Sequence, residues 1–353
     1  MNRLPLLALA CVVTALTATL PAAAAAQSSA ISTRYLRLPG LVTQVATFND
    51  RIFWIGYKDK DTRGSLYSSP LGAIEPKRLI TPPGGLPTSF QVSSRWIVID
   101  GIRVCATPKE KNCGEYASAL WKYDRRHWVE SPIIVGRRGL PLRYSLYQNK
   151  LVVSILDRYT TTVYLLDLLN GSQRLLEAVG SKQCPGAAFS VSLFGGVAVV
   201  AHIPGMLPLK PTCDRPNGVR LFDLRRGRIQ MLAQGQTVAN AFTNGTNVVW
   251  FNAAPSAEMG GIPYGSLAIK NLVTRRTEML TTSAGMPEMS ANLAFWANRF
   301  GTEVAYDIHQ QRTYVLPREK VALTRVTAWG HRLSWVDSYA TPGQTMVGLA
   351  RIP

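Results

Sequence analysis

Histidine, cysteine and acidic residues are scarce in this 353-residue chain, which has 4 His, 5 Cys and 21 Asp and Glu against 39 Lys and Arg. The histidines show neither an H-x-H nor an H-E-x-x-H spacing, and no two cysteines form a C-x-x-C pair, which argues against a zinc or redox centre. The loops G-x-x-x-x-G-K-S/T and G-x-G-x-x-G are absent, as is the G-x-S-x-G turn of α/β-hydrolases. The sequence therefore predicts no metal ion, no cofactor and none of these catalytic centres.

The shortage of acidic residues leaves a formal net charge of +18. A surface this basic attracts polyanions, such as acidic envelope polymers, anionic lipid headgroups or nucleic acid. The basic residues are, however, spread along the whole chain in runs no longer than two. That spread also fits an ordinary solvated surface, so an anionic polymer is one candidate partner and not a requirement.

Long hydrophobic runs are also missing, except at the start of the chain. Arg3 precedes an apolar stretch from Leu4 to Leu20, and a run of alanines, Ala22 to Ala26, offers A-x-A cleavage sites. We interpret residues 1–26 as a secretory signal peptide cut before Gln27, although Cys11 leaves lipidation open. No other stretch approaches 18 apolar residues, so we expect a soluble mature chain without a transmembrane span, secreted or held in the periplasm or cell envelope. Export of the chain argues against nucleic acid as the partner.

Four cysteines remain after the signal peptide: Cys105, Cys113, Cys184 and Cys213. An even number in an exported protein favours two disulfides. Three pairings can be drawn. We favour Cys105–Cys113 and Cys184–Cys213, because each pair would close a long local excursion of the chain.

One pattern recurs seven times along the chain: a polar turn, an apolar strand that ends in Asp, Asn, Gly or His, a variable loop, and two further short strands. Aligned residues of the apolar strand recur every 39 to 57 residues, at Trp54, Val98, Ile155, Val200, Trp250, Trp296 and Trp335. This spacing is typical of a propeller blade of four short strands. We expect a disulfide-closed insertion at Cys105 and Cys113 to explain the longest interval.

The sequence thus predicts an all-β chain that forms a single β-propeller over residues 27–353. We expect seven four-stranded blades, with six if the repeat around Leu151 or Val197 is misread. The last repeat is one strand short, and an extra strand at residues 34–39 would complete it and close the ring. The expected blades span about residues 42–81, 88–133, 143–178, 189–234, 238–281, 287–316 and 325–353.

The third strands of the repeat have the form Gly-Ser-Leu-(Tyr) followed by Asp or Asn and Leu, as in GSLYSSPL (64–71), NGVRLFDL (217–224) and GSLAIKNL (265–272). Together with the preceding apolar-apolar-Trp strands, they resemble the repeats of TolB-like propellers. The resemblance covers most of the mature chain, but the usual Pro-Asp-Gly turn and the small domain that precedes the TolB propeller are missing. It implies an envelope location and a role in protein interaction.

The residues that end the second strand of each blade are the sharpest candidates for a binding site. Besides Gly56 they are Asp100, Asp157, His202, Asn252, Asn298 and Asp337. In a closed ring they would lie at one height on one face, where they could bind a cation, a sugar or a peptide amine. Asp and Asn are also favoured at strand ends because they cap the following turn. Three long loops, residues 105–116, 202–217 and 252–264, belong to the same face.

The opposite face carries basic turns between the third and fourth strands. They predict a peripheral rim made of Arg125, Arg126, Arg225, Arg226, Arg228, Arg275 and Arg276. Such a rim could dock on an anionic wall or membrane, or could simply be a solvated set of turns that prevents edge pairing.

Two functions remain open from the sequence. The first is a non-enzymatic binding or scaffold module of the cell envelope, whose loop face holds a protein or glycan. The alternative is a hydrolase or lyase acting on an acidic polysaccharide, with Asp100, Asp157 and Asp337 supplying acid–base chemistry. The absence of a catalytic motif favours the first.

Overall fold

The computed structural model describes residues 31–57, 64–81, 85–103, 117–127, 129–133, 140–157, 159–182, 184, 186–204, 218–235, 238–253, 264–290, 292–298, 302–316, 326–341 and 344–353. All regular structure in these ranges is β-strand, which confirms the expected all-β class. Within the same ranges, no helix has the length and apolar character that a membrane crossing requires.

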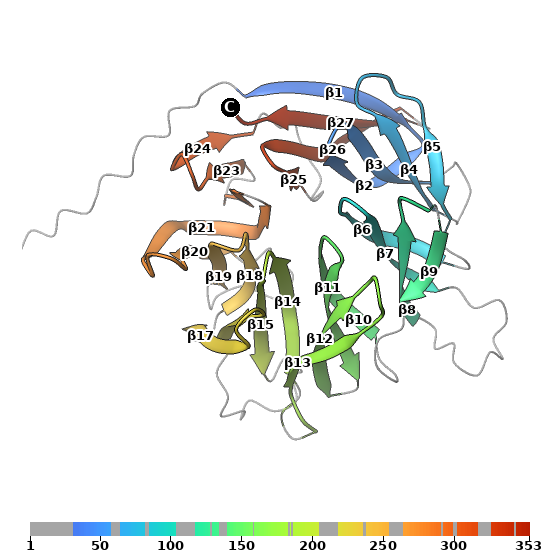
Figure 1. The fold of residues 1–353 in the computed structure, drawn as a ribbon. Coiled ribbons are helices and arrows are strands. Elements are labelled where there is room, and N and C mark those ends of the chain that lie inside the picture. Colours follow the sequence, from blue (N-terminus) through green and yellow to red (C-terminus); the bar gives the residue numbers. More distant parts are fainter. Residues whose placement is uncertain are drawn as a thin grey trace, which may run out of the picture.

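The strands form antiparallel units of four, called blades here, arranged around a common centre (Figure 1). Blade 1 consists of β2 (Leu41–Phe48), β3 (Arg51–Tyr57), β4 (Ser65–Pro70) and β5 (Lys77–Ile80). Blade 2 consists of β6 (Gly85–Val92), β7 (Trp96–Arg103), β8 (Ala117–Asp124) and β9 (Val129–Ile133). Blade 3 consists of β10 (Leu140–Tyr147), β11 (Lys150–Asp157), β12 (Thr160–Asp167) and β13 (Gln173–Val179). Blade 4 consists of β14 (Gly186–Phe194), β15 (Val197–Pro204), β16 (Gly218–Asp223) and β17 (Arg228–Gln234).

The next two blades share one seven-stranded sheet. Its strands are β18 (Val238–Thr243), β19 (Asn247–Ala253), β20 (Tyr264–Asn271), β21 (Thr277–Ser290), β22 (Leu293–Ala297), β23 (Glu303–Asp307) and β24 (Arg312–Val315). The 14-residue β21 pairs with β20 at its start and with β22 at its end. It therefore serves as the outer strand of blade 5 and the inner strand of blade 6.

The two ends of the described chain meet in one sheet. Blade 7 consists of β25 (Thr327–Trp329), β26 (Arg332–Thr341), β27 (Gln344–Arg351) and β1 (Ser32–Pro39). β1 pairs along its whole length with β27, from Ser32 opposite Arg351 to Pro39 opposite Gln344. The extra N-terminal strand thus takes the outer position expected for it, beginning two residues earlier than the sequence indicated.

The hydrophobic core is divided among the junctions between blades. Seven clusters of buried side chains each join two neighbouring blades, and they run from the junction of blades 1 and 2 round to that of blades 7 and 1. The tryptophans of the repeat supply the largest buried side chains, with Trp54 and Trp335 fully buried. Burial on both faces of each sheet explains why the second strands of the repeat are continuously apolar.

Polar side chains of the inner strands join each blade to the next. Gln44 exchanges two hydrogen bonds with the main chain of Phe90, at 2.8 and 3.1 Å, and Gln91 does the same with Leu146 and Tyr144, at 2.7 and 3.0 Å. Thr327 donates from Oγ1 to the carbonyl of Val45 at 2.8 Å, which links blade 7 to blade 1. These bonds fix the inner strands relative to one another and make the centre of the ring a rigid support.

Candidate functional site

The strand register identifies equivalent positions in the seven blades. In each blade the residue after the third strand donates a backbone hydrogen bond to the residue before the second strand. The accepting residues are Asp50, Arg95, Asn149, Gly196, Thr246, Asn292 and His331. Six residues beyond them lie Gly56, Gly101, Ile155, His202, Asn252, Asn298 and Asp337. Asp100 therefore stands one position before the common level, and Asp157 two positions after it, so the predicted set is not one ring.

The environments of the predicted residues differ. Asp157 is exposed, whereas Asp337 is buried and accepts a hydrogen bond from Trp335 Nε1 at 3.2 Å. Asn298 accepts a hydrogen bond from the backbone N–H of Thr302 at 3.0 Å, as expected of a residue that caps a turn. Asn252 donates to Ser266 Oγ at 3.4 Å. Among these four, only Asp157 combines a charge with full exposure.

Asp100 has the most unusual surroundings. It lies in β7 beside a bulge of the inner strand β6, between Pro87 and Ser89, and the exposed Thr88 donates from Oγ1 to Asp100 Oδ2 at 3.1 Å. Asp100 Oδ1 is buried and has no hydrogen-bond partner among the described residues. Burial raises the pKa of Asp100, against the lowering effects of Thr88, the backbone of Gly101 and the charge of Arg143 on blade 3.

The bulge beside Asp100 belongs to a repeated feature. The inner strands of blades 1 to 5 all bulge at the same level, between Val42 and Gln44, Pro87 and Ser89, Pro141 and Arg143, Ala188 and Ser190, and Val238 and Asn240. A bulge bends a strand and redirects the side chains next to it, and bulges are common beside binding sites. The sequence pattern did not reveal them, because one inserted residue per blade is hidden by loops of unequal length.

The three long loops of this face lie largely outside the described residues, as do Cys105, Cys113 and Cys213. Cys184 lies within the described part and is disulfide-bonded. Its preferred pairing with Cys213 and that of Cys105 with Cys113 stay predictions from the sequence.

On the opposite face, the third strand of five blades ends in an Asp or Asn residue. The third-strand pattern of the sequence already contained this residue. Its side-chain Oδ1 accepts the backbone N–H two residues further on in five blades, at Asp124, Asp167, Asp223, Asn271 and Asp307. Each of these residues closes a turn between the third and fourth strands. Three of these turns, those that follow Asp124, Asp223 and Asn271, carry or adjoin the arginines of the predicted basic rim.

The members of the basic rim are not equivalent. Arg125 donates to the carbonyl of Ser93 at 2.7 Å and lies 5.2 Å from the rings of Phe48 and Phe53, and burial lowers its pKa. It is part of the junction between blades 1 and 2. Arg226, Arg228, Arg275 and Arg276 are exposed, although Arg276 pairs with Glu278 at 3.0 Å.

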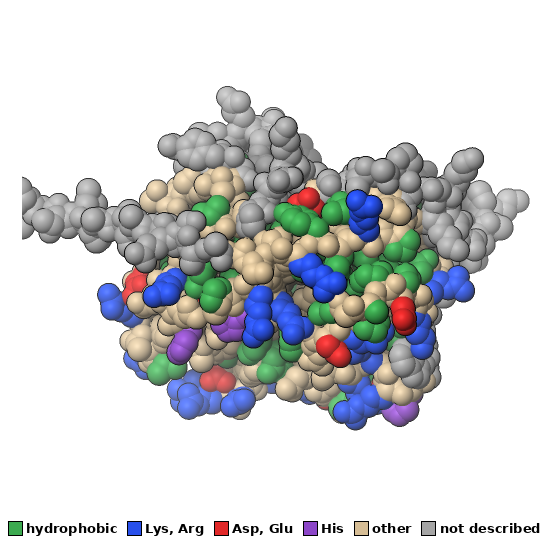
Figure 2. All heavy atoms as spheres, turned by 90° about the horizontal axis from the view of Figure 1, so that it is seen from above, with side chains coloured by type: hydrophobic (Ala, Val, Ile, Leu, Met, Phe, Trp, Pro, Cys, Tyr) green, Lys and Arg blue, Asp and Glu red, His purple; other side chains and the backbone are tan. Residues whose placement is uncertain are grey.

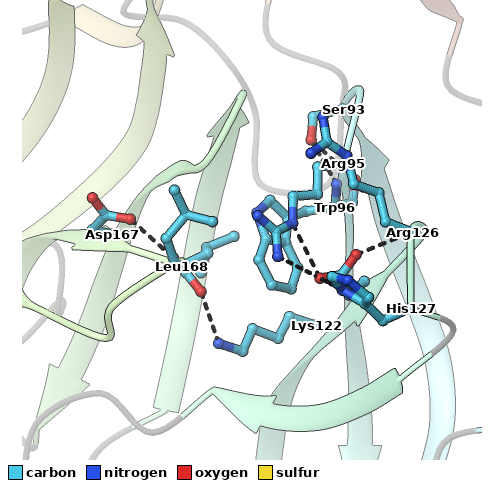
Figure 3. Close-up of polar contacts among 10 residues, drawn as sticks. Ser93, Arg95, Trp96, Lys122, Arg126, His127, Asp167 and Leu168 are labelled. Carbon is cyan, nitrogen blue, oxygen red and sulfur yellow. Dashed lines mark hydrogen bonds and ion pairs between the residues drawn. The ribbon is translucent and has the colours of Figure 1, made fainter.

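Asp124 accepts hydrogen bonds from Arg95, His127 and the backbone of Arg126. Figure 3 shows these three partners beside Trp96 and Lys122 at the junction of blades 2 and 3. Burial opposes the ionisation of Asp124, but these hydrogen bonds hold the pKa of Asp124 well below its usual range. Arg95 and Lys122 also lie 4.9 and 5.0 Å from the ring centre of Trp96, and Lys122 donates to the carbonyl of Leu168 at 3.0 Å. These charges brace two blades.

Groups of three or more His, Cys, Asp or Glu side chains suited to a metal ion do not occur in the described part of the chain.

Comparison with known proteins agrees with the fold. The β-propeller domain of the trilobed protease from Pyrococcus furiosus matches with a TM-score of 0.57 at 11% identity, over 88% of this chain and 95% of that one. The WD40 domain of Pan2 from Neurospora crassa matches with a TM-score of 0.52 at 12% identity, over 89% and 90%. TolB from Acinetobacter baumannii matches with a TM-score of 0.44 at 14% identity, over 90% and 79%. No family model and no curated protein matches the sequence.

The chain is therefore a β-propeller protein. The matched structures differ widely in function and share little sequence with this chain, so they show its fold alone. TolB is one of several similar propellers, and the TolB-like family is a narrower assignment than these likenesses support.

Proposed function

We propose that this protein is a non-enzymatic binding module of the cell envelope, related to TolB-like propellers, and that its partner, a protein or glycan, is held by the face that carries the strand-end residues. The secretory signal read from residues 1–26 supports the envelope location. The three long loops predicted on this face support the choice of surface, because binding residues concentrate on loops that a rigid scaffold positions.

The surroundings of Asp100 carry the proposal. A carboxylate whose ionisation is opposed by burial, and whose Oδ1 has no partner among the described residues, weakens the fold at neutral pH. Thr88 and Arg143 lie beside it on inner strands of two blades. A hydrogen-bond donor on a bound partner that reached this carboxyl group would offset part of the cost of ionising it.

The test is crosslinking and recovery of the partner from intact cells at low and high salt, with Asp100→Asn and, as a matched control, Asp50→Asn at an exposed position on the opposite face. The pKa of Asp100 is raised in the folded state, so its ionisation costs stability as the pH rises towards neutrality. Asp100→Asn should therefore fold at least as stably as the parent at neutral pH, but lose the partner. Asp50→Asn should keep it. Retention of the same salt-resistant partner by Asp100→Asn would contradict the proposed site.

One observation favours the alternative, a hydrolase or lyase acting on an acidic polysaccharide. A raised pKa is what a general acid near neutral pH requires, and Arg143 beside Asp100 could pair with a substrate carboxylate. The second carboxylate of such a mechanism is harder to supply, because Asp157 and Asp337 lie on other blades, one exposed and one buried. Turnover of an acidic polysaccharide that Asp100→Asn abolishes would establish this function in place of the first.

A further inference from the structure

A cavity of about 220 Å³ lies where blade 7 meets blade 1, on the face opposite the strand-end residues. Arg34, Arg332 and Arg351 line it, together with Leu71 and Leu349. Figure 2 looks onto the outer edge of the ring from the side of β1 and shows several Lys and Arg side chains near the middle of that edge. The three arginines lie outside the basic rim predicted from the sequence.

The strand register brings the three arginines together on one face of the sheet. Arg332 of β26 stands directly opposite Arg351 of β27, so their Cβ atoms are about 4.5 to 5.5 Å apart. Arg34 of β1 stands opposite Leu349, which places it diagonally from Arg351. Like charges in directly opposite positions destabilise a sheet unless an anion lies between them.

Side chains of this chain do not provide that anion within the described residues. Arg34 Nη1 donates to the carbonyl of Leu71 at 3.5 Å, and Arg332 Nη1 donates to the carbonyl of Asn49. None of the three guanidinium groups forms an ion pair with a described carboxylate. Three positive charges therefore share one cavity with neutral acceptors only.

A buried hydroxyl completes the cavity. Thr47 lines it from blade 1, its side chain is 5% exposed, and Thr47 Oγ1 has no hydrogen-bond partner among the described residues. A buried hydroxyl without a partner costs free energy unless it meets an acceptor. An anion oxygen in the cavity would be such an acceptor.

The equivalent positions in blade 3 contain a cation and a carboxylate. There Lys150 occupies the position of Arg332, and Asp167 that of Arg351, and the two side chains pair at 2.6 Å. In blade 7 an arginine has replaced this carboxylate. The carboxylates of the described residues therefore do not supply the anion that would balance the charges in this cavity.

We propose that this cavity binds the phosphate group of a small phosphate monoester. Guanidinium groups bind phosphate oxygens in pairs, and a phosphate monoester carries about −1.5 to −2 charges at neutral pH, which suits three arginines better than a single carboxylate does. The leucines beside the arginines provide an apolar wall for the carbon skeleton of the ester. This site is separate from the proposed partner-binding face, so either can fail without the other.

The test is calorimetric titration of the full chain with glycerol 3-phosphate and with inorganic phosphate, in chloride buffer of matched ionic strength. Both should bind, and the ester at least as tightly as the free ion. Arg351→Asp restores the residue type of blade 3, should fold normally by pairing with Arg332, and should weaken binding by about tenfold or more. Arg228→Asp makes the same charge change on the exposed outer strand of blade 4 and should leave binding unchanged.

If both variants weaken phosphate binding equally, the binding depends on net charge alone and the proposal is overturned. The absence of binding above the chloride blank would also overturn it. If inorganic phosphate binds and glycerol 3-phosphate does not, the proposal of a phosphate ester is overturned and the free ion is the ligand. If Arg351→Asp does not fold, Arg34→Gln on the exposed outer strand takes its place, with a smaller loss expected.

Discussion

Two cavities on the same face of the ring occupy equivalent places, one between blades 7 and 1 and the other, of about 420 Å³, between blades 3 and 4. Six residues in the wall of each cavity correspond through the strand register. The pairs are Ser32 and Ser172, Arg34 and Arg174, Leu71 and Leu224, Arg332 and Lys150, Leu349 and Leu165, and Arg351 and Asp167. Only the last pair differs in the sign of its charge.

Among these matched pairs, this difference separates the ion pair of blade 3 from the proposed ligand site of blade 7. In blade 3, Asp167 closes its turn through Leu169, pairs with Lys150, and accepts a hydrogen bond from Asn149 at 3.1 Å. In blade 7 the arginine at the same position can do none of these things. A propeller repeat can thus gain a binding site by losing one stabilising residue, because the other blades hold the ring together.

The variant with the largest expected effect on stability gives blade 3 the charge pattern of blade 7. Asp167→Arg removes the turn closure and the ion pair, and sets two like charges directly opposite each other. We expect a loss of about 1 to 2 kcal/mol in the free energy of unfolding, measured by chemical denaturation. Phosphate at constant ionic strength should restore part of the loss, because the mutated cavity then resembles that of blade 7.

The matched control is Asp157→Arg, which makes the same charge change at an exposed strand end. Its stability should stay within about 0.5 kcal/mol of the parent, with or without phosphate. If Asp167→Arg is equally harmless, the carboxylate is not structural and the comparison fails.

Acid should act on the two cavities differently. Burial opposes the ionisation of Asp167, but Lys150, Leu169 and Asn149 bind the carboxylate and lower its pKa in the folded state. The unfolded value is about 3.9, so the stabilisation is complete above that pH and is lost as the pH falls through the lower, folded pKa. Asp167→Asn should therefore flatten the decline in unfolding free energy below about pH 4.

Arg351→Asp should steepen the same decline, because it adds a second carboxylate paired with a cation. Both variants can be followed by denaturant titration at a series of pH values. Identical acid profiles for the parent and Arg351→Asp would mean that the new carboxylate does not pair with Arg332.

The sequence predicted the fold better than the sites. The apolar strands that contain Trp54, Trp250, Trp296 and Trp335 gave a period that the strand pairing confirms. The same alignment placed Asp100 and Asp157 at one level with His202. It matched the polar residue that ends each strand, and it did not detect that a strand can be one or two residues shorter or longer than its equivalents. Register depends on cross-strand hydrogen bonds, which a single strand does not reveal.

The sequence alone did not reveal the arginine cavity, for a related reason. Arg34 lies about 300 positions before Arg332 and Arg351 in the chain, and only the pairing of β1 with β27 brings them together. The Asp that closes the third-strand turn was visible in the repeat, but its replacement by Arg351 gains meaning only when the positions are matched through the sheet.

The finest test concerns the shape of the cation, since the proposal depends on guanidinium groups and not on charge alone. Arg332→Lys keeps the charge, and its stability should stay within about 0.5 kcal/mol of the parent. Its affinity for glycerol 3-phosphate should fall several-fold, because an ammonium group cannot bind two phosphate oxygens in a planar fork. Lys150→Arg makes the reverse change in blade 3, where Asp167 already neutralises the cation, so it should create no phosphate binding. Unchanged affinity in Arg332→Lys would show that the cavity attracts anions only through its net charge, and calorimetry on the two variants side by side distinguishes these outcomes.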